Sequence, residues 1–168
     1  MLYKPHGYQR FAEEFIETHP EAGLFLDMGL GKTVTTLTAL SKLRWDVDKI
    51  LVIAPKRPAL DTWPEEIGKW DHLKDLTYSV VMGSPKQREA ALAVEADIYI
   101  INRENVVWLV NQFKRKPWPF DCVVIDELSS FKSPKAQRFR ALKRVRPQIR
   151  RIIGLTGTPA GNGLMDLW

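Results

Sequence analysis

The sequence predicts an α/β protein with a doubly wound, mainly parallel β-sheet and helices on both faces. Short, continuous apolar runs alternate with helix-like segments, as expected when each strand is buried and a crossover helix leads to the next strand. The clearest apolar runs are 50–54, 97–101 and 122–125, and each is followed by polar residues. Because ligands of such sheets bind at the carboxyl ends of the strands, those polar residues mark the expected site.

The first half of the chain supplies three predicted strands and the helices between them. Tyr8, Phe11 and Phe15 recur at helical spacing and predict an amphipathic helix over 7–19. In order, we expect a strand from residue 24, a helix from 32 to about 43, a strand at 50–55, a helix through 63–70 and a strand at 77–82.

The second half repeats the alternation of strands and helices. Ser84 and Pro85 have the N-cap and first-turn pattern of a helix that runs to about Val94. In order, we then expect a strand at 97–101, a helix at 105–113, a basic loop at 114–119, a strand at 122–127, a helix at 134–145 and a strand at 151–156.

The overall composition is that of one ordinary globular domain. The 168 residues suffice for one core, and the net charge of +5 permits a polyanionic partner without requiring one. Cys122, the one cysteine, lies in an apolar run and is expected to be a buried core residue. No apolar run approaches the ~20 residues of a membrane span, so no membrane partner is expected.

The segment 24–33 has the layout of a phosphate-binding loop between a strand and a helix. Gly29 and Gly31 allow the backbone N–H groups to approach an anion, Lys32 would reach the β- and γ-phosphates, and the Thr33 hydroxyl would bind Mg²⁺. The general pattern also has glycine where this chain has Leu26. A plain glycine turn is therefore the alternative interpretation of this segment alone.

Two carboxylates follow the strand predicted at 122–125. Asp126 could hold Mg²⁺, and Glu127 could orient or deprotonate an attacking water molecule. An isolated Asp-Glu pair can also be a solvated strand end. Together with Lys32 and Thr33, the pair predicts metal-assisted hydrolysis of a nucleoside triphosphate. Gln9 could read an adenine base through its amide, although a solvent-facing helix glutamine is the alternative.

Four segments together resemble the first motor lobe of Swi/Snf-type ATPases, which belong to the superfamily two helicases and translocases. They are 27–33 (DMGLGKT), 52–55 with Trp63 and Glu66, 125–127 with Lys132 and Ser133, and 155–159 (LTGTP) with Asn162. The resemblance covers nearly the whole chain and accounts for Leu26, because this group does not keep the first glycine. It implies one RecA-like lobe over 1–168, with the second motor lobe absent from this chain.

The resemblance also implies roles for individual residues, with ATP and Mg²⁺ as cofactors. Lys32 and Glu127 would be catalytic, and Thr33 and Asp126 would hold the metal. The nucleotide would be bound by Gln9, Met28, Gly29, Leu30, Gly31, Lys32 and Thr33. DNA contact or coupling would fall to Lys56, Arg57, Asn102, Arg103, Lys132, Thr156, Gly157 and Thr158. Plain surface charge is the alternative for the four cations of that set.

The implied function is an ATP-dependent DNA translocase lobe that grips the phosphate backbone of duplex DNA and works with a second lobe. An isolated lobe is expected to hydrolyse ATP very slowly, because the second lobe carries the arginine fingers. Two alternatives stay open, a non-catalytic nucleic-acid-binding module and an RNA helicase lobe of the same superfamily. The short connections between motifs favour a bacterial or phage protein in the cytoplasm, whereas a eukaryotic one would be nuclear.

The chain departs from the family pattern within its acidic motif. The family usually continues Asp-Glu-Ala-His, whereas this chain reads Asp-Glu-Leu-Ser at 126–129. The missing histidine normally bridges the nucleotide and the motif around Thr156. Because the Ser129 side chain is shorter, we expect this coupling to be weaker or to follow another route.

Overall fold

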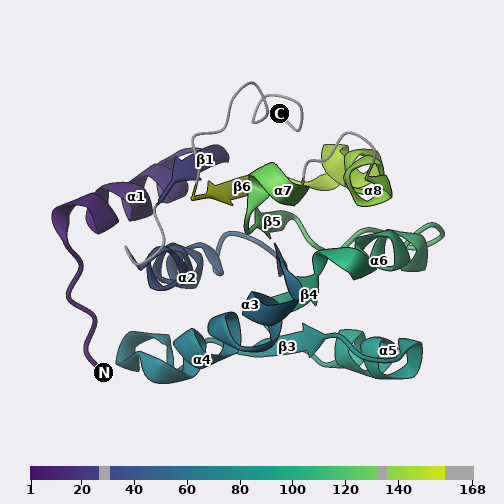
Figure 1. The fold of residues 1–168 in the computed structure, drawn as a ribbon, viewed down its shortest axis with the longest axis horizontal. Helices are drawn as coiled ribbons and strands as arrows, with labels where there is room; N and C mark the ends of the chain where they lie inside the picture. Colours follow the sequence, from purple (N-terminus) through teal and green to yellow (C-terminus); the bar gives the residue numbers. More distant parts are fainter. Residues whose placement is uncertain (27–30, 132–135, 158–168) are drawn as a thin grey trace.

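The computed structural model describes residues 1–26, 31–131 and 136–157 (Figure 1). Its strands are β1 Glu21–Phe25, β2 Ile50–Ala54, β3 Tyr78–Val81, β4 Ile98–Asn102, β5 Cys122–Ile125 and β6 Arg151–Thr156. Its helices are α1 Gly7–Thr18, α2 Lys32–Leu43, α3 Lys56–Leu60, α4 Thr62–Lys69, α5 Pro85–Ala93, α6 Val106–Gln112, α7 Leu128–Phe131 and α8 Gln137–Val145. Short 3₁₀ turns occupy η1 Asp71–Leu73, η2 Arg103–Asn105 and η3 Arg146–Gln148.

The six strands form one sheet in the order β1-β6-β5-β2-β4-β3, and every neighbouring pair is parallel. The central strands β2, β4 and β5 are buried along their whole length, which explains their unbroken apolar sequences. The prediction of a parallel α/β sheet is confirmed.

Helices cover both faces of the sheet, as the doubly wound prediction requires. Figure 1 shows α1, α2 and α4 on one side of the strands and α5, α6 and α8 on the other. Alternate strand residues divide accordingly, with Val52 facing one apolar cluster and Leu51 and Ile53 facing the other.

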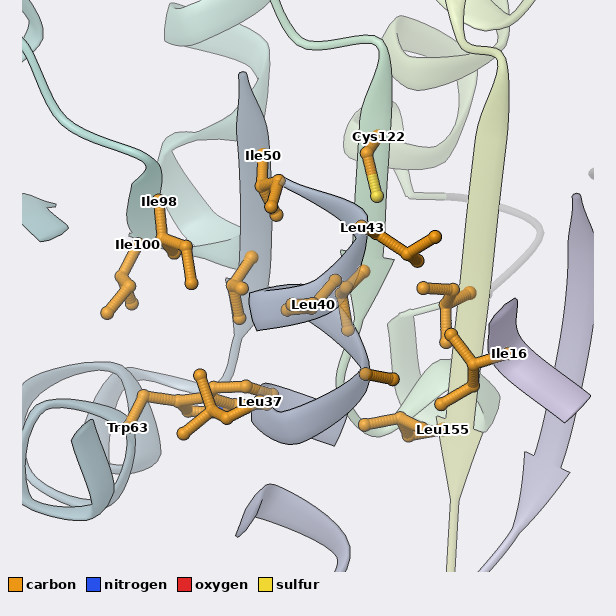
Figure 2. Close-up of a cluster of buried hydrophobic side chains, with 14 of the residues drawn as sticks. Ile16, Leu37, Leu40, Leu43, Ile50, Trp63, Ile98, Ile100, Cys122 and Leu155 are labelled. Atoms are coloured by element: carbon orange, nitrogen blue, oxygen red, sulfur yellow. The ribbon is translucent and has the colours of Figure 1, made fainter. Parts of the chain in front are cut away.

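Helix α2 is the central helix of the first face. Its residues Leu37, Leu40 and Leu43 lie against Ile50, Cys122 and Leu155 from three different strands (Figure 2). Full burial of each leucine stabilises the fold by roughly 1.5–3 kcal/mol. This packing fixes α2, and therefore its N-terminus, relative to the carboxyl ends of the strands.

The predicted elements agree with the structure apart from their ends and two short helices. The strand predicted at 122–127 ends at Ile125, so Asp126 and Glu127 follow β5 instead of lying within it. The helix predicted at 134–145 is described only from Gln137 onward. Helices α3 and α7 were not predicted. Cys122 is fully buried, as expected, and burial raises the pKa of its thiol to about 12.

Candidate active site

The candidate site lies where β1, β5 and β6 end, three neighbouring strands whose carboxyl ends meet at one edge of the sheet. The chain leaving β1 leads to Gly31 and Lys32 at the start of α2, and β5 is followed by Asp126 and Glu127. Thr156 ends β6 and is buried. The structure therefore brings together residues that are more than ninety positions apart in the sequence.

Gly31 is the N-cap of α2 and has a left-handed backbone, with φ 68° and ψ 38°. A Cβ atom at this position would lie 2.6 Å from Nε2 of Gln9, so a side chain would be both strained and crowded. The glycine thus lets α1 and the start of α2 approach each other closely. The first N–H groups of α2 and its dipole favour an anion at this end.

Lys32 lies between the two carboxylates that follow β5. Its Nζ donates to Oδ1 of Asp126 and to Oε1 of Glu127, at 2.9 Å in each case. Burial opposes the charge of Lys32, but the two carboxylates outweigh it, and the net effect raises the pKa of the ammonium group above its usual value. The ammonium group is therefore held charged at neutral pH, between the carboxylate predicted to hold the metal and the one predicted to be catalytic.

Asp126 is 2% exposed, and both of its carboxylate oxygens have partners. Oδ1 binds Lys32, and Oδ2 accepts a hydrogen bond from Nε1 of Trp63 at 3.0 Å. Trp63 is fully buried and belongs to α4, which follows β2 and α3 in the chain. The predicted metal carboxylate is thus held from two directions.

Glu127 is the one non-glycine residue in the described ranges with a positive φ, 59°. The left-handed conformation is costly for a residue with a long side chain, and such strain is concentrated at functional sites. Its carbonyl accepts the N–H groups of Ser130 and Phe131, which begins the short helix α7. The sharp turn after Asp126 directs the Glu127 side chain toward Lys32.

A pocket of about 450 Å³ opens at these groups, and its volume lies within the usual range of small-molecule sites. Its lining residues are Gly31, Lys32, Thr33, Val34, Pro58, Thr62, Glu66, Lys69, Trp70, Asp126 and Glu127. A second pocket of about 340 Å³ shares Gly31, Val34 and Trp70 with the first and extends to Tyr8 and Gln9. The second pocket thus lies next to the first, between it and the start of α1.

Gln9 lies in that second pocket but has a structural role as well. Its Oε1 accepts the N–H of His6 at 2.9 Å, which forms half of a capping box at the start of α1. Gln9 is 6% exposed, so the solvent-facing alternative is wrong.

The residues present fit a magnesium ion bound together with phosphate. Mg²⁺ is commonly held by one or two carboxylates with substrate phosphate oxygens and water completing the shell. Asp126 and the hydroxyl of Thr33, which is 5% exposed at the N-terminus of α2, match that donor set. Within the described ranges there is no group of three or more His, Cys, Asp or Glu side chains that could hold a metal ion.

The cations predicted to face DNA fall into two groups. Lys56 and Arg57 are exposed on α3 and line a pocket of about 420 Å³ with Leu60 and Asp61. Arg103 instead has partners within the protein: it forms an ion pair with Glu104, 3.4 Å from Nε to the carboxylate, and donates a hydrogen bond to the hydroxyl of Ser130.

Asn102, which ends β4, is also engaged within the protein. It is buried, its Nδ2 donates to Glu104 at 3.2 Å, and its Oδ1 accepts a hydrogen bond from Asn105 at 2.6 Å. Asn102 is thus less available for a DNA contact than Lys56 and Arg57.

Ser129 contacts Thr156 directly, with 3.3 Å between the two hydroxyl oxygens. The end of β5 and the end of β6 are therefore linked by side chains even though histidine is absent at position 129. Of the other predicted site residues, Gly157 follows β6, while Met28, Gly29, Leu30, Lys132 and Thr158 lie outside the described residues.

Several residues in and behind the pocket received no role from the sequence. Glu66, Lys69 and Trp70 line it from α4 and the residue after it, and Trp63 lies behind Asp126. A signal was available, because Trp63 and Glu66 belong to the segment beyond β2 that carries the family resemblance. The contact of Trp63 with Asp126 joins positions 63 residues apart in the chain, and spacing alone does not reveal it.

Comparisons with known proteins agree with this geometry. The family of SNF2-related domains matches residues 9–168. A p41 protein of Acyrthosiphon pisum secondary endosymbiont phage 1 is 38% identical over 99% of this chain and 38% of its own length. The ISWI chromatin-remodeling complex ATPase ISW1 of Saccharomyces cerevisiae is 32% identical over 88% of this chain and 13% of its own length. This chain therefore spans well under half of these relatives.

Two solved structures share the fold. The Sulfolobus solfataricus SWI2/SNF2 ATPase core in complex with dsDNA is 26% identical, with a TM-score of 0.77 over 99% of this chain and 34% of that one. The UvsW helicase of bacteriophage T4 has a TM-score of 0.74 over 98% of this chain and 57% of that one. At 16% identity, the latter supports the fold alone. No helix in the described ranges is long and apolar enough to cross a membrane.

Proposed function

The chain belongs to the family of SNF2-related domains, and from that premise we propose that it is the ATP-binding lobe of a motor that hydrolyses ATP and moves along duplex DNA. The observation that carries this proposal is Lys32, held 2.9 Å from both Asp126 and Glu127 at the N-terminus of α2. These three side chains, with Thr33, are among the groups that phosphoryl transfer to water uses.

In this mechanism the residues of the chain act by positioning and by charge. Lys32 leaves the carboxylates to bind the β- and γ-phosphates, against which the N–H groups of α2 also lie. Thr33 and Asp126 would hold Mg²⁺, which would supply neutralisation of the phosphate charge. Glu127 orients the attacking water and accepts its proton. Gln9 contacts the adenine from the second pocket.

We propose that DNA is bound through its phosphate backbone on the surface that carries Lys56 and Arg57. Both are exposed on α3, directly after β2. Contacts of this kind are insensitive to sequence and weaken as salt is added. Arg103 already bonds to Glu104 and Ser130, so we expect it to support the surface rather than dominate binding.

We further propose that residues 1–168 form one lobe of a two-lobed motor and that the chain alone turns over ATP very slowly. An arginine finger supplied by a partner domain contributes about 10³–10⁵ in rate in related chemistry. A turnover near ~1 s⁻¹ for this chain alone would contradict this part of the proposal.

The first experiment is calorimetry with a non-hydrolysable ATP analogue and Mg²⁺ on the wild-type chain, Lys32→Ala and Lys42→Ala. Lys42 is a matched control, because it lies in the same helix but is 57% exposed and pairs with Glu17 at 3.3 Å. We expect binding to be lost in Lys32→Ala and kept in Lys42→Ala. Absence of binding by the folded wild-type chain would contradict a complete nucleotide half-site and favour the non-catalytic module.

A second experiment tests the nucleic acid. Fluorescence anisotropy with duplex DNA and duplex RNA at rising salt should show tighter binding of DNA, and the Lys56→Ala, Arg57→Ala double variant should weaken it. Lys143→Ala is a control because Lys143 lies on α8, on the other face of the sheet. Tighter binding of RNA would favour the RNA helicase alternative.

A further inference from the structure

The contact between Trp63 and Asp126 joins a core side chain to the candidate metal site. Trp63 is fully buried in the apolar cluster that contains α2, and Figure 2 shows it beside Leu37. The indole is therefore fixed by its packing. Its one polar group, Nε1–H, donates to Oδ2 of Asp126 at 3.0 Å.

The two oxygens of Asp126 have different surroundings. Oδ2 accepts the indole N–H inside the protein, whereas Oδ1 faces Lys32 and the pocket. Rotation about the Cβ–Cγ bond of an aspartate is only broadly restricted by its own torsional preference. The contacts of the two oxygens therefore determine the plane of the carboxylate. Once Lys32 moves to a phosphate, Trp63 is the one of these two partners that still holds Asp126.

We propose that Trp63 is a positioning residue for the metal carboxylate: by holding Oδ2 of Asp126, it aims Oδ1 at the position where Mg²⁺ binds with the nucleotide. The inference rests on the proposed function and assigns a role to a residue of α4 that lies behind the site. A hydrogen bond to an ionised acceptor is stronger than one between neutral groups. Partners of this kind, which orient a metal ligand, typically contribute about 10–100-fold to metal affinity.

A second buried tryptophan offers a matched control. Trp118 is 7% exposed, lies in the apolar cluster on the opposite face of the sheet, and donates its Nε1–H to the carbonyl of Phe120 at 2.7 Å. Trp63→Phe and Trp118→Phe each keep a buried ring and remove one indole hydrogen bond. A purely structural role for Trp63 predicts similar behaviour of the two variants at the nucleotide site.

The test is to measure ADP affinity with and without Mg²⁺ in the wild-type chain and both variants. In Trp63→Phe we expect metal-free ADP affinity within about twofold of wild type and a loss of about tenfold in the gain that Mg²⁺ provides, at the low end of the usual effect. Trp118→Phe should keep the full gain. An unchanged gain in Trp63→Phe, or an equal loss in Trp118→Phe, would overturn the inference.

A measurement on the wild-type chain keeps the inference testable if Trp63→Phe fails to fold. The indole ¹H–¹⁵N resonance of Trp63 should shift when Mg²⁺ is added to the ADP complex, while that of Trp118 should not. An unchanged Trp63 indole chemical shift on addition of Mg²⁺ would overturn the positioning role. If wild type binds no ADP under any condition, the proposed function falls and this inference with it, whereas normal binding with an insensitive Trp63 overturns the inference alone.

Discussion

Replacing Lys32 by methionine should destabilise the nucleotide-free chain, because it leaves two adjacent carboxylates without their shared cation. Breaking a buried ion pair costs about 3–5 kcal/mol, and an exposed pair about 0.2–1 kcal/mol. Lys32 is 15% exposed, and its partners Asp126 and Glu127 are 2% and 33% exposed. The site lies nearer the buried limit, so we expect a loss of about 2–4 kcal/mol in the free energy of unfolding.

The assay is urea unfolding of the wild-type chain, Lys32→Met, Asp126→Asn and the double variant, followed by circular dichroism. Because Lys32 and Asp126 are in direct contact at 2.9 Å, the two single changes should couple by about 1–3 kcal/mol. Lys42→Met is the control in the same helix, where the pair of the 57% exposed Lys42 with the half-buried Glu17 should contribute about 1 kcal/mol.

Additive effects, within about 0.5 kcal/mol, would refute this reasoning. They would mean that Lys32 does not bridge the carboxylates in solution and that the nucleotide-free site is arranged differently. A loss in Lys32→Met no larger than that in Lys42→Met would refute it as well, since the two lysines would then be energetically alike.

Three further predictions concern the surroundings of the site. Gly31→Ala should destabilise the chain by about 1–2 kcal/mol in urea unfolding, because the φ of Gly31 is 68° and Gln9 crowds the position. Gly68 lies in a helix with open space around it, so Gly68→Ala should raise the free energy of unfolding by about 0.4–1 kcal/mol. Burial lowers the pKa of His72, so its contribution to stability is complete above about pH 6.5 and is lost as the pH falls below it. The urea midpoint of His72→Gln should therefore fall less than that of wild type between about pH 7.5 and 5.5. An equal fall of the midpoint in both proteins would contradict this. The buried Cys122 should react with a thiol reagent only as fast as the chain opens, and rapid labelling in native buffer would contradict that burial.

The strands were predictable because each central strand carries its whole signal in a few consecutive residues. Ile50–Ala54 and Ile98–Asn102 are buried throughout, so their apolar runs identify them without any tertiary information. Helices α3 and α7, with five and four residues, are too short to show a periodic pattern. Helix propensity also disfavours a helix at α3, because α3 contains Pro58.

The site was predictable as a set of residues and not as a set of contacts. The phosphate-loop spacing and the acidic pair indicated Lys32, Asp126 and Glu127, and the parallel sheet implied that they would meet. The indole of Trp63 behind Asp126 and the left-handed turn at Glu127 depend on how α4 and β5 pack. Neither leaves a periodic or compositional trace in the sequence.

The basic residues near 146–151 illustrate the same limit. In the sequence, Arg146, Arg150 and Arg151 form a cluster of positive charge, but in the fold each has a partner within the protein. Arg146 pairs with Glu21 at 3.0 Å, Arg150 with Asp121 at 3.4 Å, and Arg151 donates to the carbonyl of Ile16 at 3.2 Å. They fix the amino ends of β1 and β6, at the opposite end of the strands from the candidate site.

The pairing of β1 with β6 has a consequence for the order of assembly during synthesis on the ribosome. Phe25 pairs in register with Thr156. Strand β1, which is synthesised first, can therefore join the sheet only after β6, the last described strand, has been synthesised. Closing so long a loop is slow compared with forming local contacts. The nascent chain can hold β2, β4 and β5 together earlier, but β1, which leads toward Gly31 and Lys32, can join the sheet only once β6 has docked. Nucleotide binding by this lobe should therefore begin only after β6 has been synthesised and has paired with β1.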